Sequence, residues 1–248
     1  MDAAKIRLYV EHPLAEGQTV LLDRDQAHYL FGVMRLTAGA PVALFNGTDG
    51  EWQAEVTAAG KRGGELTCRS RSRDQLSPPD LWLLFAPIKK TRTDFIVEKA
   101  AEMGVARIQP VQTEFTNAER IRRDRLQAHA VEAAEQCGST YIAEVAELQR
   151  LDRLLADWPA DRQLMFCDEA FADASYGTPD GAPRSLEDAP KGEWAILIGP
   201  EGGFSEAERR RLHGLPFAWP VQLGHRILRA DTAAVAALTL WQLKLGEW

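Results

Sequence analysis

The sequence is poor in cysteine and lacks a long hydrophobic segment, and both absences narrow the classes of protein to which it can belong. Its 248 residues include three cysteines, none in a CxxC pair, and five scattered histidines without an HExxH motif. This pattern favours isolated thiols over disulfides and predicts no metal site. No apolar run is long enough to span a bilayer, and no signal-peptide core follows the first residues. We therefore expect a cytoplasmic protein that does not bind membranes.

The sequence also lacks an excess of positive charge. Its net charge is −7 at pH 7, which argues against an RNA partner, because neutralisation of phosphates dominates affinity for nucleic acids. The acidity is concentrated in residues 131–193, which contain 14 acidic and five basic residues. Elsewhere the chain carries three local basic groups, namely Arg69, Arg71 and Arg73; Lys89, Lys90 and Arg92; and Arg120, Arg122, Arg123 and Arg125.

These basic groups lead to different interpretations. The group that begins at Arg120 is interspersed with Glu119 and Asp124 at helical spacing, which favours a solvated helix face. The group Lys89 to Arg92 follows a strand directly, which favours a functional role at the end of that strand.

Consecutive prolines divide the chain into two expected domains. Short strands separated by turns dominate the region before Ser77-Pro78-Pro79, and such a run of prolines continues neither a strand nor a helix. We predict a small β-barrel over residues 1–76, with a brief helix near residues 26–34. The expected strands of this domain are residues 6–10, 19–22, 42–45, 51–56 and 65–70.

Strands and helices alternate over residues 77–248, which predicts an α/β domain. A stretch rich in proline, glycine and acidic residues, Phe171 to Gly192, is typical of a long mobile loop between strands. The expected strands are residues 81–86, 107–111, 164–167, 195–198 and 221–223, and the expected helices are residues 94–103, 122–137 and 233–245.

A glycine-rich turn after an apolar strand is the most informative motif. In residues 195–208 a strand ends at Pro200, which removes a backbone donor, and a Ser-x-x-Glu capping box starts a helix. Gly202 and Gly203 permit positive φ and close approach of a ligand to the main chain. The turn lacks the lysine and spacing of phosphate-binding loops, and Glu201 would repel a phosphate. It suits a ligand with hydroxyls, amines or positive charge, although a purely structural turn is equally compatible with this segment alone.

A second strand, glycine and helix start follow in residues 220–233. Two glycine turns at the carboxyl ends of strands form the ligand crevice of open α/β sheets. Arg226 and Arg229 are both compatible with solvated charges, and Arg229, which lies closest to the helix start, is the better candidate for a functional role.

Together these motifs resemble the RsmE family of ribosomal RNA small subunit methyltransferases, which use S-adenosylmethionine and belong to the SPOUT superfamily. The resemblance extends over nearly the whole chain. It rests on Ile198–Ser205 and Leu223–Ala233, with further matches at Lys89–Asp94, Glu98–Val105, Gln109-Pro110, Ile6–Val10, His28–Leu30, Val33–Leu36 and Phe45–Gly47. It implies a C-terminal α/β domain with a trefoil-knotted parallel sheet over residues 77–248. It also implies an RNA-binding, PUA-like β-barrel over residues 1–76.

The chain departs from the family pattern at three positions. Ser139 stands where the family usually has an arginine, so an RNA contact of that arginine is not carried over. Ala143 stands near a usual proline. Asp231 replaces the usual glutamate before Thr-Ala, which keeps the charge and shortens its reach.

The resemblance implies transfer of a methyl group from S-adenosylmethionine to N3 of a uridine in 16S rRNA within the small ribosomal subunit. The expected cofactor-binding residues are Ile198, Gly199, Glu201, Gly202, Gly203, Leu223, Gly224, Ile227, Leu228, Arg229, Thr232 and Ala233. The expected RNA-binding residues are Arg7, Arg35, Lys89, Lys90, Arg92 and Arg226. Arg229 and Glu201 are the candidate catalytic residues. Glu201 suits either a general base or a partner for a cofactor hydroxyl.

The last helix is apolar around much of its circumference, which together with the resemblance predicts a homodimer through this helix, with Trp241 as a contact residue. Two other functions stay open. One is methylation of a different RNA position, a ribose 2′-oxygen or a tRNA base, on the same fold. The other is RNA binding without catalysis.

Overall fold

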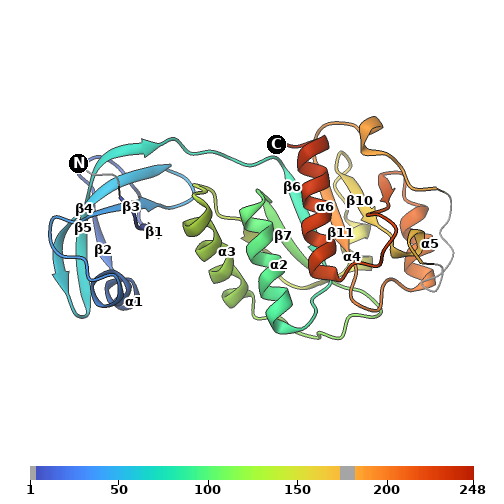
Figure 1. Cartoon of the computed structure of the whole chain (residues 1–248), viewed down its shortest axis with the longest axis horizontal. Coiled ribbons are helices and arrows are strands. Elements are labelled where there is room, and N and C mark those ends of the chain that lie inside the picture. The colour runs from blue at the N-terminus through green and yellow to red at the C-terminus, as the bar shows by residue number, and fades with distance from the viewer. Residues whose placement is uncertain (1–3, 174–181) are drawn as a thin grey trace. The chain divides into compact units, whose positions relative to one another are not determined.

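The computed structural model describes residues 4–173 and 182–248 and divides the chain into two compact units (Figure 1). One unit comprises Met1–Ser77 together with Ala134–Ile142, and the other comprises Pro78–Ala133 and Ala143–Trp248. The segment Ala134–Ile142 therefore packs with the N-terminal unit, although it follows the proline boundary in sequence.

The first unit is built on a five-stranded sheet with the strand order β1-β3-β4-β5-β2. Its strands are β1 (Arg7–Tyr9), β2 (Thr19–Leu22), β3 (Pro41–Phe45), β4 (Glu51–Gly60) and β5 (Gly63–Arg73). The β1/β3 pair is parallel and the other pairs are antiparallel. Alternation of buried and exposed residues, clearest in β2, places one face on the core. The five strands expected in this region are confirmed, and β4 and β5 continue beyond their expected ends.

The single helix expected near residues 26–34 is instead two short elements. The helix α1 (Arg24–Ala27) starts at Asp23, which forms a capping box with Gln26. It passes into a π-helix, η1 (His28–Val33), which periodicity at 3.6 residues does not predict. Arg35 follows with φ of 55°, the left-handed conformation that ends many helices.

The second unit is an α/β fold with a parallel sheet in the order β12-β10-β11-β6-β7-β8, in which β9 also pairs with β7. Its strands are β6 (Leu81–Phe85), β7 (Arg107–Gln112), β8 (Glu144–Val145), β9 (Gln149–Arg150), β10 (Gln163–Cys167), β11 (Trp194–Ile198) and β12 (Ala218–Val221). Its helices include α2 (Lys90–Glu102), α3 (Arg123–Cys137), α4 (Leu151–Ala156), α5 (Glu206–His213) and α6 (Ala230–Lys244). The predicted α/β class and parallel sheet are confirmed, and the knot stays a prediction.

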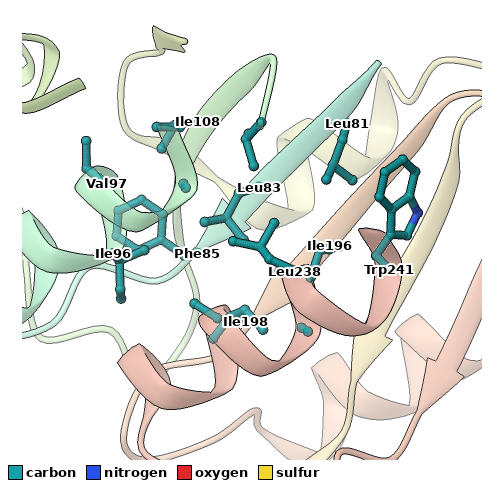
Figure 2. Close-up of a cluster of buried hydrophobic side chains, with 14 of the residues drawn as sticks. Leu81, Leu83, Phe85, Ile96, Val97, Ile108, Ile196, Ile198, Leu238 and Trp241 are labelled. Carbon is teal, nitrogen blue, oxygen red and sulfur yellow. The ribbon is translucent and has the colours of Figure 1, made fainter. Parts of the chain in front are cut away.

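The central strands are buried on both faces, as their unbroken apolar sequences predict. On one face, side chains of β6 and β11 pack against α2 and α6, which lie side by side (Figures 1 and 2). Figure 2 shows Leu83 and Phe85 of β6 with Ile96 of α2 and Leu238 of α6 in this core. Trp241 belongs to the same core and is only 1% exposed, so the expectation that it lies on a subunit contact is wrong for this residue.

Several element bounds differ from the expected ones for local reasons. The last strand is Ala218–Val221 and not residues 221–223, because Pro220 sits in an edge strand, where its missing donor is tolerated. The helix α2 begins at Lys90, four residues earlier than expected, and α6 begins at Ala230. The short strands β8 and β9 were not expected, since two residues are too few for an alternating pattern, and the six-residue helix α4 was not expected either.

The expected long mobile loop from Phe171 to Gly192 is only partly within the structure, because residues 174–181 lie outside the described ranges. Most residues of the remainder are exposed, but several contacts attach it to the sheet. A 3-10 helix at Leu186–Asp188 buries Leu186, the backbone N–H of Arg184 donates to the Pro220 carbonyl, and Trp219 Nε1 donates to the Ser185 carbonyl.

In the described ranges, none of the helices combines the length and the apolar character needed to cross a bilayer.

Candidate active site

A cavity of about 330 Å³ lies in the second unit where three adjacent parallel strands end. The strands are β12, β10 and β11, and the chain leaves each of them at the same edge of the sheet. The segments after them, which begin at Asp168, Gly199 and Gln222, line the cavity together with Arg92 of α2. This arrangement is the ligand crevice expected at the carboxyl ends of strands in α/β sheets. We call it the main cavity.

The glycine turn after β11 has a backbone that side chains would disturb. Gly203 has φ of 71° and its N–H donates to the Pro200 carbonyl at 2.9 Å. A Cβ at Gly199 would come within 2.8 Å of the Phe204 ring, so this position needs glycine for packing. Ser205 then caps α5 through a capping box with Glu208. The turn therefore presents main-chain atoms to the cavity in a fixed conformation.

The segment after β12 offers unpaired backbone groups. In the described part of the chain, the backbone N–H and C=O groups of Leu223 to Leu228 form no intramolecular hydrogen bond. Gly224 has φ of 102°, and open space surrounds the position of its missing Cβ. Polar backbone groups normally find partners, so a cavity wall with several free ones is suited to a polar ligand.

A buried ionic network holds the third segment in place. Asp168 follows β10, and its carboxylate accepts a hydrogen bond from Arg209 Nε of α5 at 2.9 Å and lies 2.7 Å from His213 Nε2. The side chains of Asp168 and Arg209 are 0% and 3% exposed. Buried charges are stable only when they are paired in this way. The network therefore fixes the end of β10 relative to the helix that follows the glycine turn.

Glu169 connects this network with the glycine turn. Its Oε1 accepts hydrogen bonds from the Phe204 N–H at 2.9 Å and from Arg209 Nη2 at 2.8 Å. Burial raises the pKa of this carboxyl above its ordinary value, although the hydrogen bond from Phe204 acts in the opposite direction. The neighbouring Cys167 also lines the cavity, and burial raises the pKa of its thiol.

Arg92 lies between two carboxylates at the cavity. Its Nη1 is 4.0 Å from Glu201 Oε1, and its Nε is 3.7 Å from Asp231 Oδ2. Both distances exceed that of a hydrogen bond, so the guanidinium is attracted to the two acids and still has its donors available. A planar set of donors in such a position suits a uracil oxygen or a phosphate.

The structure brings most of the residues singled out by sequence to the main cavity. Those that line it are Ile198, Gly199, Glu201, Gly203, Leu223, Gly224, Ile227, Leu228, Arg229 and Ala233. Arg92 and Arg226, which were expected to bind RNA, line it too. Gly202 and Thr232 do not, and a Cβ at Gly202 would instead meet Phe115 at 3.3 Å.

The other candidates for RNA binding lie elsewhere. Lys89 is the exposed residue before α2, Lys90 lines a second cavity described below, and Arg35 is exposed in the first unit. Arg7 is largely buried, and its guanidinium donates to Glu51 Oε2 and to carbonyls of the helix α3 end and Ser139. These contacts give Arg7 a structural role inside its unit, and RNA binding by it stays a prediction.

Sequence reasoning missed the acidic pair Asp168 and Glu169 and their partner Arg209. The available signal was the position of two acids directly after an expected strand, at the same edge as the two glycine turns. Their partner lies about 40 residues away in α5, and nothing local in the sequence indicates that pairing.

Comparison with known proteins agrees with this geometry. The family model of the RNA methyltransferase domain matches residues 75–242, and that of the RNA methyltransferase PUA domain matches residues 22–67. The chain belongs to the RNA methyltransferase family. The relationship inferred from the sequence motifs is thereby confirmed.

This RNA methyltransferase is similar over its whole length to proteins of known name. It is 27% identical over 233 residues to ribosomal RNA small subunit methyltransferase E of Rickettsia conorii, with 94% of this chain and 93% of that protein covered. A crystal structure of ribosomal RNA small subunit methyltransferase E from Neisseria gonorrhoeae bound to S-adenosyl methionine has 27% identity and a TM-score of 0.86, and the match covers 98% of this chain and 99% of the other. A methyltransferase from Legionella pneumophila, solved with the bound cofactor SAM, has 28% identity and a TM-score of 0.86, with 99% and 100% covered.

Proposed function

We propose that this protein transfers a methyl group from S-adenosylmethionine to N3 of a uridine in 16S rRNA. The observation that carries the proposal is the main cavity, whose walls are the main-chain atoms of two glycine loops at the carboxyl ends of parallel strands. The similarity to ribosomal RNA small subunit methyltransferases, one of them solved with the cofactor, supports both the cofactor and the RNA substrate.

The residues of the main cavity fit S-adenosylmethionine. Its volume of about 330 Å³ lies in the range of pockets for small ligands. The free backbone groups between Leu223 and Leu228 would bind the polar edges of the cofactor, and Ile198 and Leu223 would supply apolar contacts for its adenine. The half-exposed carboxylate of Glu201 suits a ligand with positive charge. When bound, the cofactor supplies an electrophilic methyl group on a positively charged sulfur.

The residues of the chain would assist the transfer mainly by placement and by exclusion of water. Uracil N3 must lose its proton to become a nucleophile, and opposite charges are neutralised as the methyl group moves. A site with little water therefore favours the reaction. Arg92 and Arg229 orient the uracil or its phosphate through their guanidinium donors. Glu201, which lies beside Arg92, either accepts the proton or binds a hydroxyl of the cofactor.

The decisive experiment is nucleoside analysis of small-subunit rRNA. Subunits from a strain that lacks the enzyme are incubated with the protein and S-adenosylmethionine, and the digested RNA is examined by mass spectrometry. We expect one 3-methyluridine per rRNA molecule. A 2′-O-methylated nucleoside, or methylation of tRNA alone, would assign the other specificity on this fold. Failure of the protein to bind S-adenosylmethionine in calorimetry would leave RNA binding without catalysis.

We also propose that the active form is a cytoplasmic homodimer whose contact includes the exposed side of α6. Leu243 is 60% exposed and Trp248 57% exposed, and Ile227 in the segment before the helix is 40% exposed. Exposed large apolar side chains near one helix are typical of protein contacts. Replacement of Leu243 by Glu should produce monomers in light scattering without unfolding the chain. A wild-type protein that is monomeric and fully active would refute the dimer.

A further inference from the structure

A second cavity lies in the same unit on another side of the start of α2. Its volume is about 460 Å³, and the segment after β6, the first turn of α2 and the start of α3 line it. Four cations line it, Lys90, Arg120, Arg122 and Arg125, together with the half-buried apolar residues Ile88 and Ile121. We call it the basic cavity. The sequence favoured a solvated helix face for the group that begins at Arg120. Arg120, Arg122 and Arg123 are exposed, and three arginines of the group also line this cavity.

The charge of the basic cavity is only partly balanced by acids. Arg125 pairs with Asp94 at 2.6 Å, and Arg122 pairs with the exposed Asp124 at 2.8 Å. The side chains of Lys90 and Arg120 form no hydrogen bond or ion pair with any described residue. Two unpaired cations that line a cavity together with apolar side chains suit an anion joined to a flat apolar group.

The basic cavity lies close to the main cavity along the sequence and in the sheet. Lys90 and Arg92 both belong to the first turn of α2, and residues two apart on a helix point in different directions. Accordingly, Arg92 lines the main cavity and Lys90 the basic one. The strands that lead to them, β11 and β6, are neighbours in the sheet. A polynucleotide that passes over the first turn of α2 would therefore reach both cavities.

We propose that the basic cavity binds a nucleotide of the substrate RNA next to the one that is methylated. Lys90 and Arg120 bind its phosphate, and Ile88 and Ile121 contact its base. This inference rests on the proposed function, because it assumes that an RNA nucleotide enters the main cavity. It adds a second subsite and assigns a role to Arg120.

The test is a double variant, Lys90→Ala with Arg120→Ala, assayed with a 16S rRNA transcript over a range of salt concentrations. Loss of the contact with one phosphate of single-stranded RNA should make the slope of log affinity against log salt less steep by about 0.7. The dissociation constant for the RNA should rise on the order of tenfold at low salt. Affinity for S-adenosylmethionine, measured by calorimetry, should stay unchanged because neither residue lines the main cavity.

A matched control removes the same charge from the same unit. Lys191→Ala with Arg210→Ala replaces two exposed cations that do not line the basic cavity, so its salt slope should stay at the wild-type value. A third variant, Ile121→Ser, should weaken RNA binding and leave the slope unchanged, because it removes a base contact and no charge. Equal slopes for the Lys90/Arg120 variant and wild type would overturn the proposal, as would an equal loss in the control.

The outcome is separable from that of the proposed function. If wild-type protein binds the transcript but produces no 3-methyluridine, the proposed function is refuted. The salt slopes still test the subsite in that case. If methylation proceeds and the slopes are equal, the subsite alone is refuted. A further result would also refute the subsite. If excess inorganic phosphate makes wild type and the Lys90/Arg120 variant bind RNA equally, without displacing the RNA, the cavity holds free phosphate and not a nucleotide.

Discussion

Arg209 donates a hydrogen bond from Nε to Asp168 Oδ1 at 2.9 Å, and neither side chain is more than 3% exposed. The pair joins the end of β10 to α5, and Arg209 also reaches Glu169, which in turn holds the Phe204 N–H in the glycine turn. Two of the three segments around the main cavity are thus connected through one buried guanidinium.

Replacement of Arg209 by Leu should lower the free energy of unfolding by about 3–5 kcal/mol, because it leaves the Asp168 carboxylate buried without its charged partner. Denaturant unfolding measures the change. Arg210→Leu on the same helix is the control, since Arg210 is exposed and its substitution should cost less than about 0.5 kcal/mol. Similar losses in the two variants would show that the buried pair is not important for stability.

Replacement of Glu169 by Gln should change how stability depends on pH. Burial raises the pKa of the folded-state carboxyl above its ordinary value of 4.5. Protonation of Glu169 therefore stabilises the folded state. This stabilisation is fully present below the pKa that Glu169 has in the unfolded chain, and it is lost as pH rises through its folded-state pKa. The difference in unfolding free energy between wild type and Glu169→Gln should accordingly fall as pH rises above about 4.5. A difference that stays constant or increases with pH would contradict this assignment.

Replacement of Gly203 by Val should cost about 1–2 kcal/mol of stability, because a β-branched residue resists φ of 71°. It should also abolish measurable binding of S-adenosylmethionine in calorimetry, since the side chain enters the wall of the main cavity. Gly39→Val is the control. Its φ is 87° with open space around the Cβ position, so it should cost similar stability and leave cofactor affinity intact. Retained affinity in the Gly203 variant would show that the turn does not contact the cofactor.

Replacement of Arg7 by Met should destabilise the first unit by about 2–3 kcal/mol. The change removes the ion pair with Glu51, which is 4% exposed, and the hydrogen bonds to the end of α3 and to Ser139. Glu51 keeps its contacts with Arg73 and Ser72, which limits the loss. Arg69→Met, which breaks a half-exposed pair with Glu55, should cost less than about 0.5 kcal/mol. An RNA-binding defect in Arg7→Met with unchanged stability would instead support the role expected from sequence.

Local signals in the sequence determined much of the fold and part of the site. The strand at Trp194–Ile198, the turn with Gly203 at positive φ and the capping box of Ser205 and Glu208 follow from apolar runs, glycine conformation and helix capping. Each of these features depends on residues within a few positions of one another, so the local sequence is sufficient to predict it.

Contacts between distant residues decided the rest. Asp168 and Glu169 become part of the cavity wall because Arg209, in a helix that begins 37 residues after Glu169, meets them in space. Arg7 has a structural role because the end of α3 and Ser139 pack with its sheet. Arg120 lines the basic cavity because the segment before α3 lies near the start of α2. Burial and pairing of charges are properties of the assembled tertiary structure, whereas turn conformation and capping are already present in the local sequence.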